Sequence, residues 1–526
     1  MTRPTPSGAR SIRRALGVLG GSTVESGEYV PKSGPLTEFG GLPGCEEIER
    51  YWVDPPFAFV SINHDPTENE HHYHVVVPEL DGFERRLLEI LLKDIRTPLL
   101  YREDASDDPE RVLREELANQ LETYGVGIDT RSFHRLFYYL RRAFRGYGRI
   151  DPLMCDPHIE DISCDGYEIP LFVYHDEYTD IETNISFSET GLDSFVIRLA
   201  QQSGRHVSVG DPVTETTLPD GSRAELALGR EVTPRGSAYT IRKYAEEPMT
   251  PIDLIQYRTF DTSQMAYLWL AIEHNKSLLF AGGTASGKTT AMNAVSMFIP
   301  PRAKVLTIED TRELTLQHEN WLSSITREGA RDGASITMYD LLRSALRHRP
   351  EYIIVGEVRG EEAITLFQAM NTGHTTYSTM HADSVQTVIN RLENEPINVP
   401  RAMVQSLDVL CIQTLTRVGD ERVRRTETIA EIDGIDTRTG ELDYSRAYRW
   451  QPGTDSFERN EGRVPDSIRE AEGWSQSELR TEISRRKRFL ETLSANGITD
   501  FRRFSELVNA YYADPKTALE RIGALR

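Results

Sequence analysis

The sequence predicts an α/β fold, with a parallel sheet in the second half of the chain. An apolar run at residues 277–281 has the length of a buried strand, and a glycine-rich loop at 282–289 follows it directly. Apolar residues then recur at helical spacing until Pro300, which ends the helix. Three further apolar runs of strand length lie at residues 305–308, 352–355 and 375–379. A strand, a loop and a helix in this order are typical of a parallel α/β domain.

The glycine-rich loop has the pattern G-x-x-x-x-G-K-T, from Gly282 to Thr289. In this pattern backbone N–H groups turn towards phosphates, the Lys288 ammonium reaches the β- and γ-phosphates, and the Thr289 hydroxyl can ligate Mg²⁺. The N-terminus of the following helix adds a partial positive charge. The flanking strand and helix distinguish the loop from a chance glycine-rich turn. The sequence therefore predicts a site for ATP and Mg²⁺ formed by Gly282, Gly283, Thr284, Ala285, Ser286, Gly287, Lys288, Thr289 and Thr290.

Charged side chains follow three of the other predicted strands at the point where each strand ends. Glu309 and Arg312 follow the second apolar run, Glu357 follows the third, and His381 follows the fourth. In an open parallel sheet, ligands bind outside the carboxyl ends of the strands. We therefore expect these side chains to face the nucleotide held by Lys288.

The two carboxylates suit phosphoryl transfer, which depends on positioning and on charge stabilisation. Glu357 occupies the Walker B position, where a carboxylate holds Mg²⁺ through water and orients the attacking water. Glu309 is the candidate general base for that water. The alternative is that both acids form salt bridges in loops. Delivery of acids from two separate strands to the same edge favours the functional interpretation.

The histidines and arginines allow more than one interpretation. His374 and His381 could sense the γ-phosphate, contact a neighbouring subunit or form structural hydrogen bonds. Arg312 lies three residues beyond Glu309 and is a candidate for stabilising transition-state charge. For Arg343 and Arg347 a structural role on one helix face is favoured.

Composition excludes several other classes of protein. The net charge is −22, with 82 acidic and 60 basic residues, only eight of them lysine. This acidic, lysine-poor composition suggests a halophile, because a high-salt cytoplasm screens self-repulsion. It also argues against broad nucleic-acid binding, which requires clustered cations. No apolar run approaches the length of a membrane helix, so any membrane role is expected to be peripheral. The first 21 residues lack the apolar segment of a secretory signal.

Cysteine and histidine spacing gives no metal motif. The four cysteines are scattered without a C-x-x-C pair, so we expect neither a disulfide framework nor a four-thiolate zinc site. A predicted hairpin, with strands at residues 57–62 and 73–77, carries His64, His71, His72 and His74. A solvated hairpin face is favoured there over a metal site.

Changes in residue composition and in the spacing of apolar residues along the chain predict several regions. The boundaries are marked by a segment rich in Gly, Pro and Ser, by short strands with turn dipeptides, and by a capping box at Ser475 and Glu478. A second C-terminal helix is expected to begin at Thr499. The predicted regions are a disordered tail at 1–44, a hairpin and helical region at 45–150, an α+β domain at 151–245, a linker at 246–262, a nucleotide-binding domain at 263–450 and a helical region at 451–526.

These motifs together resemble those of the type II/type IV secretion-system ATPases, which are motors of secretion, pilus and archaellum assembly. The matching segments are the P-loop at 282–289, the Asp box at 308–314, Walker B at 354–359 and the His box at 372–375 and 379–382. Segments at 159–166, 218–223 and 239–243 resemble the N-terminal domain of the archaeal branch. The four-cysteine zinc site of many bacterial members is absent, which also favours that branch.

The resemblance implies a ring homo-hexamer. Each subunit would have a PAS-like N-terminal domain joined by a flexible linker to a RecA-like P-loop ATPase domain, with ATP between them. Arg223 and Arg242 match the N-terminal arginines that approach the phosphates in this family. The expected partner is a polytopic membrane platform protein at the inner face of the cell membrane. Which filament or substrate would be served stays open.

Two other functions are compatible with the motifs. A RecA-like nucleic-acid translocase would need a basic channel and DNA-stimulated hydrolysis, which the net charge disfavours. A nucleotide-dependent scaffold would bind ATP without turnover, which the two intact carboxylates disfavour.

Overall fold

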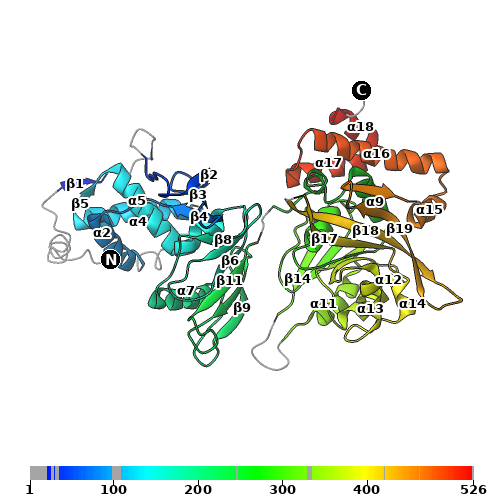
Figure 1. Ribbon diagram of the computed structural model, residues 1–526, viewed down its shortest axis with the longest axis horizontal. Coiled ribbons are helices and arrows are strands. Elements are labelled where there is room, and N and C mark those ends of the chain that lie inside the picture. The colour runs from blue at the N-terminus through cyan, green and yellow to red at the C-terminus, as the bar shows by residue number, and fades with distance from the viewer. Residues whose placement is uncertain are drawn as a thin grey trace. The chain divides into compact units, whose positions relative to one another are not determined.

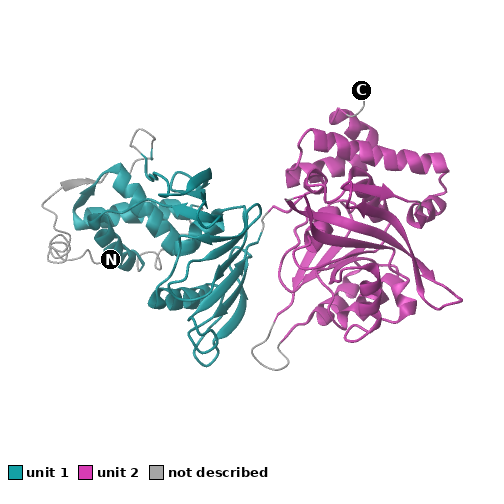
Figure 2. Ribbon diagram, viewed as in Figure 1, with its two compact units in different colours: residues 1–244 teal, residues 245–526 magenta. Residues whose placement is uncertain are grey.

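The structure is a computed structural model that describes residues 21–24, 29, 35–96, 108–244, 247–327, 335–419, 421–460 and 462–523. The chain divides into two compact units, Met1–Tyr244 and Ala245–Arg526 (Figure 2). The division falls at the start of the linker predicted at 246–262. Each unit has its own hydrophobic cores and its own nine-stranded sheet (Figure 1).

The sheet of the first unit joins two regions that the sequence analysis treats as separate. The predicted hairpin is present as β3 and β4, and β4 pairs in parallel with β8, more than 100 residues later, through His72↔Glu182 and Tyr73↔Thr183. The boundary predicted near residue 150 therefore does not divide the sheet. Its strands, in spatial order, are β2 (Glu46–Asp54), β3 (Ala58–Asp65), β4 (Glu70–Val76), β8 (Thr179–Thr183), β7 (Phe172–His175), β6 (Ile159–Cys164), β11 (Ala238–Arg242), β10 (Arg223–Ala227) and β9 (Val213–Thr217).

A buried carboxylate forms hydrogen bonds that link the two regions of this sheet. Asp156 is fully buried, and its Oδ2 accepts a hydrogen bond from Tyr51 at 2.8 Å and another from Tyr73. These tyrosines lie on β2 and β4, whereas Asp156 directly follows helix α6 (Asp151–Cys155). A buried carboxylate requires such donors, because unpaired it would lose its hydration without compensation.

The helices of the first unit form a second core and cover part of the sheet. Leu87, Leu117 and Phe133 are among its fully buried members. Of the segment predicted to be a disordered tail, residues 1–20, 25–28 and 30–34 lie outside the described residues. Leu36, by contrast, is buried in this core, and β1 (Gly21–Val24) pairs with β5 (Val126–Ile128). The helices of this core are α2 (Gly82–Asp94), α4 (Pro109–Tyr124) and α5 (Thr130–Phe144), whereas α7 (Glu189–Gln202) packs in the core of the sheet.

The sheet of the second unit is parallel over six strands and antiparallel over the last three. The strand that precedes the glycine-rich loop, β12, lies between β16 and β17 in the middle of the sheet. Its strands, in spatial order, are β14 (Trp321–Ile325), β13 (Val305–Glu309), β15 (Tyr352–Val355), β16 (Thr375–His381), β12 (Leu278–Gly282), β17 (Val409–Val418), β18 (Glu421–Ile435), β19 (Leu442–Gln451) and β20 (Ser456–Arg459).

Helices cover both faces of this sheet (Figure 1). One layer is α11 (Met338–Ala345), α12 (Glu362–Asn371), α13 (Val385–Glu393) and α14 (Arg401–Val404). The other is α8 (Pro251–Gln256), α9 (Thr262–Glu273), α10 (Lys288–Ser296), α15 (Arg463–Glu472), α16 (Gln476–Ala495), α17 (Phe501–Ala513) and α18 (Pro515–Arg521). The C-terminal helices pack on α9, where Trp269 contacts Phe489 and Tyr511.

The ends of the C-terminal helices follow from their caps. The predicted capping box is present, with Ser475 and Glu478 bonded to each other's backbone. The next helix begins two residues later than predicted, at Phe501, because Asp500 and not Thr499 accepts from the Arg503 N–H at 2.7 Å. Asp is at least as good an N-cap as Thr.

Glu431 on β18 connects the sheet to the C-terminal helices. It is fully buried and accepts from Tyr267 Oη at 2.7 Å, from Val464 N at 3.0 Å and from Arg463 N. The two backbone donors belong to the first turn of α15, which has no side-chain cap of its own. Glu431 thus supplies the missing acceptor for that helix.

We expect Glu431→Ala to lower the free energy of unfolding of the second unit by about 3 kcal/mol, because three donors, two of them buried, would lose their acceptor. Chemical denaturation followed by tryptophan fluorescence measures this change. Glu427→Ala is the matched control, since Glu427 is exposed on the same strand. Equal stability of the two variants would contradict the structural role of Glu431.

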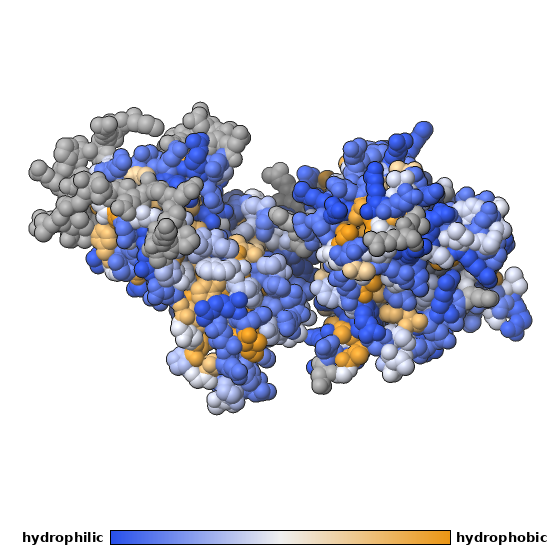
Figure 3. All heavy atoms as spheres, turned by 90° about the horizontal axis from the view of Figure 1, so that it is seen from above, coloured by the Kyte–Doolittle hydropathy of each residue, from blue (hydrophilic) through white to orange (hydrophobic). Residues whose placement is uncertain are grey.

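No helix among the described residues is long and apolar enough to cross a membrane. On the face drawn in Figure 3, apolar residues form small patches on a largely hydrophilic surface.

Candidate functional site

The glycine-rich loop connects the end of β12 to the start of α10 in a tight turn. Ala285 and Gly287 both have positive φ, at 57° and 87°. At Gly282 a Cβ would lie 2.4 Å from the carbonyl oxygen of Gln413, so only glycine fits there. The Lys288 ammonium donates to the Gly283 carbonyl at 2.7 Å, which folds this side chain back over the loop. Burial lowers the pKa of Lys288, while the charge of Glu357 opposes that effect.

The predicted residues after three other strands lie at the same edge of the sheet. In the strand register His381 is opposite Gly282, and Val355, two residues before Glu357, is opposite Ser378. The Glu357 carboxylate is 3.4 Å from the His381 Nε2 and accepts from Arg359 at 2.7 Å. Burial and the nearby Lys288 both lower the pKa of His381. Lys288, Glu357 and His381 therefore form one cluster of ionisable side chains.

Glu309 is the most unusual group at this edge. It is 1% exposed, and its Oε1 accepts from the backbone N–H groups of Glu313 and Leu314, both at 2.8 Å. Its Oε2 is buried without a hydrogen-bond partner among the described residues. Burial raises the pKa of Glu309 to about 7. Glu309 lies beside the strand that delivers Glu357, since a Cβ on Gly356 would be 3.4 Å from its Cγ.

A carboxyl group with a pKa near neutrality can accept a proton at working pH. The unpaired oxygen needs a polar partner that none of the described residues supplies. Glu309 therefore has both the protonation behaviour and the free acceptor that a general base requires. The other groups of this edge include a lysine and a carboxylate, and a threonine follows the lysine in the chain; these are the residue types that a triphosphate and Mg²⁺ require.

The other candidates of the second unit lie farther from the loop or in structural contacts. Arg312 packs on the Trp321 ring at 5.5 Å, yet its charge still acts on Glu309. His374 directly precedes β16, so it lies at the end of that strand opposite to His381, and it contacts Thr372 Oγ1 at 3.3 Å. Arg343 lies over the Tyr339 ring of its own helix. These placements favour a structural role for His374 and Arg343.

Arg223 and Arg242 belong to the first unit, where they are opposite each other on β10 and β11. Each is paired with an acid of a neighbouring strand: Arg223 with Glu215, and Arg242 with Asp161 at 3.2 Å. The Arg242 side chain is 60% exposed, so its guanidinium is available to a further anion.

Comparison with known proteins assigns this α/β architecture to a family. A model of the Type II/IV secretion system protein family matches residues 177–484, more than half of the chain. The protein is a member of the type II/IV secretion system protein family. The match begins within the first unit and includes the glycine-rich loop and all the candidate residues of the second unit.

Two smaller models match the ends of this secretion-family protein. A PilB3-like N-terminal model covers residues 7–79, and a PilB3-like C-terminal model covers 453–525. The second match accounts for the helical region that no sequence motif assigns.

Curated relatives and solved structures of this secretion family include proteins from both archaea and bacteria. The uncharacterised protein MJ0900 of Methanocaldococcus jannaschii is 36% identical over 384 residues, which are 72% of this chain and 70% of MJ0900. The type IV secretion system protein PtlH of Bordetella pertussis is 32% identical over 280 residues, 46% of this chain and 82% of PtlH. The ATPase DotB of Legionella pneumophila has a TM-score of 0.40 at 19% identity, covering 67% of this chain and 92% of DotB.

The structure adds one residue near the loop that the sequence analysis did not identify. Arg424 on β18 donates from its Nε to the Ala285 carbonyl at 3.0 Å. No local motif marks this arginine. The only local signal is that Arg424 lies among several arginines around a glycine, within residues 417–425.

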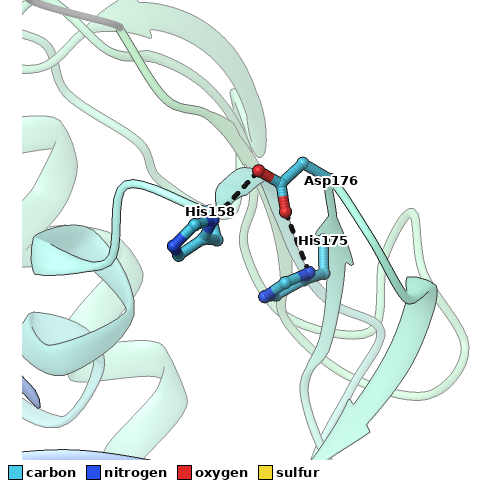
Figure 4. A group of neighbouring side chains, drawn as sticks. All are labelled: His158, His175 and Asp176. Atoms are coloured by element: carbon cyan, nitrogen blue, oxygen red, sulfur yellow. Dashed lines mark hydrogen bonds and ion pairs between the residues drawn. The ribbon is translucent and has the colours of Figure 1, made fainter. Parts of the chain in front are cut away.

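His158, His175 and Asp176 of the first unit form a second group of polar side chains (Figure 4). Asp176 contacts both imidazoles, at 3.0 Å from His158 Nδ1 and 3.1 Å from His175 Nδ1. Both nitrogens of His175 are already engaged, because Nδ1 accepts from Glu177 N at 3.1 Å and Nε2 lies 3.2 Å from Tyr51 Oη. We therefore interpret this group as a hydrogen-bond network beside Asp156 and not as a metal site.

The histidine-rich hairpin agrees with the same interpretation. His72 lies near Asp65 and Glu68 at the hairpin tip, but the Asp65 carboxylate already accepts from Thr67 N at 2.7 Å. The Glu68 and Asp65 side chains are exposed or half-exposed. A solvated hairpin remains the simpler interpretation.

Proposed function

We propose that this protein is an ATP-hydrolysing motor of the type II/IV secretion class that powers assembly of a pilus-like or archaellum filament, or secretion. One observation carries the proposal: Lys288, Glu309, Glu357 and His381 gather at the carboxyl edge of a sheet whose P-loop strand is central, in a chain of this family. The strand order supports a RecA-like domain, and the antiparallel strands β6 to β11 with helix α7 support a PAS-like one.

Each residue of the proposed site would have its own role in ATP hydrolysis. Residues Gly282–Gly287 would surround the phosphates of ATP with backbone N–H groups, and Lys288 would leave the Gly283 carbonyl for a phosphate oxygen. Thr289 and, through water, Glu357 would hold Mg²⁺, which supplies charge neutralisation when bound. Glu309 would take the proton of the attacking water through its free Oε2.

The remaining candidate residues would stabilise negative charge on the phosphates. Arg312 and His381 would stabilise the charge of the transferred phosphoryl group, and Arg223 and Arg242 would approach the phosphates from the first unit. The motor would be a homo-hexamer at the inner face of the cell membrane, docked on a polytopic platform protein. Nucleotide state would move the two units of each subunit relative to each other.

A phosphate-release assay on the full chain tests the proposal. We expect hydrolysis of ATP with Mg²⁺, complete loss in excess EDTA, and no stimulation by single- or double-stranded DNA. DNA stimulation would favour a translocase instead, and tight ATP binding without phosphate release would favour a scaffold. Mass measurement in solution with a non-hydrolysable ATP analogue would test the hexamer. Salt-dependent stability would support adaptation to high salt.

A further inference from the structure

A β-hairpin beside the glycine-rich loop extends past the edge of the sheet where the nucleotide site is proposed. Strand β17 pairs in parallel with β12 until Gln413 meets Gly282, the last residue of β12. The strand continues to Val418, beyond that point, and is paired there with the start of β18. The β17–β18 hairpin therefore runs alongside the loop.

Arg424 of this hairpin contacts the tip of the loop at two places. Its Nε donates to the carbonyl oxygen of Ala285 at 3.0 Å. Its Cδ lies against Gly287, where an added Cβ would be only 3.4 Å away. The aliphatic stem and the guanidinium thus cover both left-handed residues of the loop, Ala285 and Gly287.

The conformation of Ala285 needs such support. A residue with a Cβ at a φ of 57° costs about 1 kcal/mol relative to the right-handed region. Such a conformation persists only where the surroundings determine it. In loops of this sequence pattern the backbone N–H groups turn towards the phosphates, so the conformation of Ala285 bears on the proposed nucleotide binding.

Arg424 is itself held in place by the next residue along the strand. Arg425 is 4% exposed and forms a two-point ion pair with Asp455, at 2.8 and 3.0 Å. Its guanidinium also donates to the carbonyl of Arg424 at 2.9 Å and to that of Tyr257 at 3.0 Å. A buried, bidentate arginine is among the more rigid anchors that a strand can have.

We propose that Arg424 is a positioning residue that holds the tip of the glycine-rich loop in its phosphate-binding conformation and thereby sets the affinity for a nucleoside triphosphate. This inference rests on the proposed function. Arg424 acts through the Ala285 carbonyl and not on the phosphoryl group that is transferred. Its removal should therefore weaken nucleotide binding more than it slows the chemical step.

Three substitutions separate this role from a direct effect of charge. Arg424→Ala removes both the donor and the charge. Arg424→Gln keeps an N–H donor at the position of Nε but carries no charge, whereas Arg424→Lys keeps the charge and loses the planar donor. Arg422→Ala is the matched control, since Arg422 is exposed on the same strand two residues earlier.

The readouts are the Kd of a fluorescent ATP analogue with Mg²⁺, and KM and kcat for ATP. We expect Arg424→Ala to raise Kd and KM about tenfold, which corresponds to about 1.4 kcal/mol, with kcat changed less than about threefold. Arg424→Gln should recover most of the affinity, and Arg422→Ala should resemble the wild type. Thermal unfolding without nucleotide should be the same for all four variants.

Other outcomes would overturn the inference in recognisable ways. Rescue by Lys but not by Gln would assign Arg424 a direct charge contact with the nucleotide. A loss of kcat at unchanged Kd would make it part of the chemical step. Binding without hydrolysis by the wild type would refute the motor while the Kd series still tests Arg424, and absence of binding by the wild type would refute both.

Discussion

Replacing Lys288 by alanine is expected to lower ATP turnover at least about a thousandfold. The side chain is 7% exposed, and its ammonium is the cation at the edge where Glu357 and His381 meet. It would neutralise phosphate charge from within the glycine-rich loop, and alanine leaves no cation at that position. Phosphate release under saturating ATP measures the loss.

A second lysine of the same unit provides the control. Lys304 directly precedes β13, at the opposite end of that strand from Glu309. Lys304→Ala should keep turnover within about twofold, because surface substitutions away from a site have small effects. Near-normal hydrolysis by the Lys288 variant would refute the location of the site, whatever happens to the control.

Glu309→Gln is expected to slow hydrolysis about 10²- to 10⁴-fold while leaving ATP binding nearly intact. The amide keeps the size of the side chain and can still accept from Glu313 N and Leu314 N, but it cannot take a proton. A Kd measured with the fluorescent analogue separates binding from chemistry. Glu319→Gln, at an exposed acid before β14, should behave as the wild type.

The pH dependence of the wild type follows from the same residue. Burial raises the pKa of Glu309 from its ordinary 4.5 to about 7, so the ionised form that can act as a base appears as pH rises through 7. We therefore expect turnover to rise between about pH 6 and 8 and then to level off. A turnover profile that is flat across this window would exclude Glu309 as the base.

The free energy of unfolding should change with pH in the direction opposite to turnover. A raised carboxyl pKa means that the folded state favours the neutral form, so the stabilisation is fully present below pH 4.5 and is lost as pH rises through about 7. Glu309→Gln removes this loss, because the amide is neutral throughout. The variant should gain stability relative to the wild type between pH 5 and pH 8 in denaturant titrations, and Glu319→Gln should not.

Some of this molecule could be predicted because the signals are local. The glycine-rich loop and its flanking strand and helix were readable from spacing alone, and so were the acids that follow β13 and β15. The hairpin β3–β4 and the Ser475 capping box likewise depend on residues close together in the chain. The family match over 177–484 agrees with the motifs that suggested it.

Other features depend on residues far apart in the chain and could not be predicted. The pairing of β4 with β8 joins two predicted regions into one sheet, and Asp156 bridges Tyr51 and Tyr73 across that junction. The contact between Arg424 and Ala285 exists because the β17–β18 hairpin happens to extend past the end of β12. Strand register over such distances leaves no local pattern.

The sequence by itself determined which chemical groups lie at the proposed nucleotide site: a glycine-rich loop, a lysine, two carboxylates and a histidine at strand ends. Only the tertiary structure decided how these groups are buried, hydrogen-bonded and protonated. Burial raises the pKa of Glu309 to about 7, although the N–H groups of residues 313 and 314 that bond to its Oε1 lower the pKa. Its Oε2 has no hydrogen-bond partner among the described residues. Desolvation is a property of packing that residue order does not express.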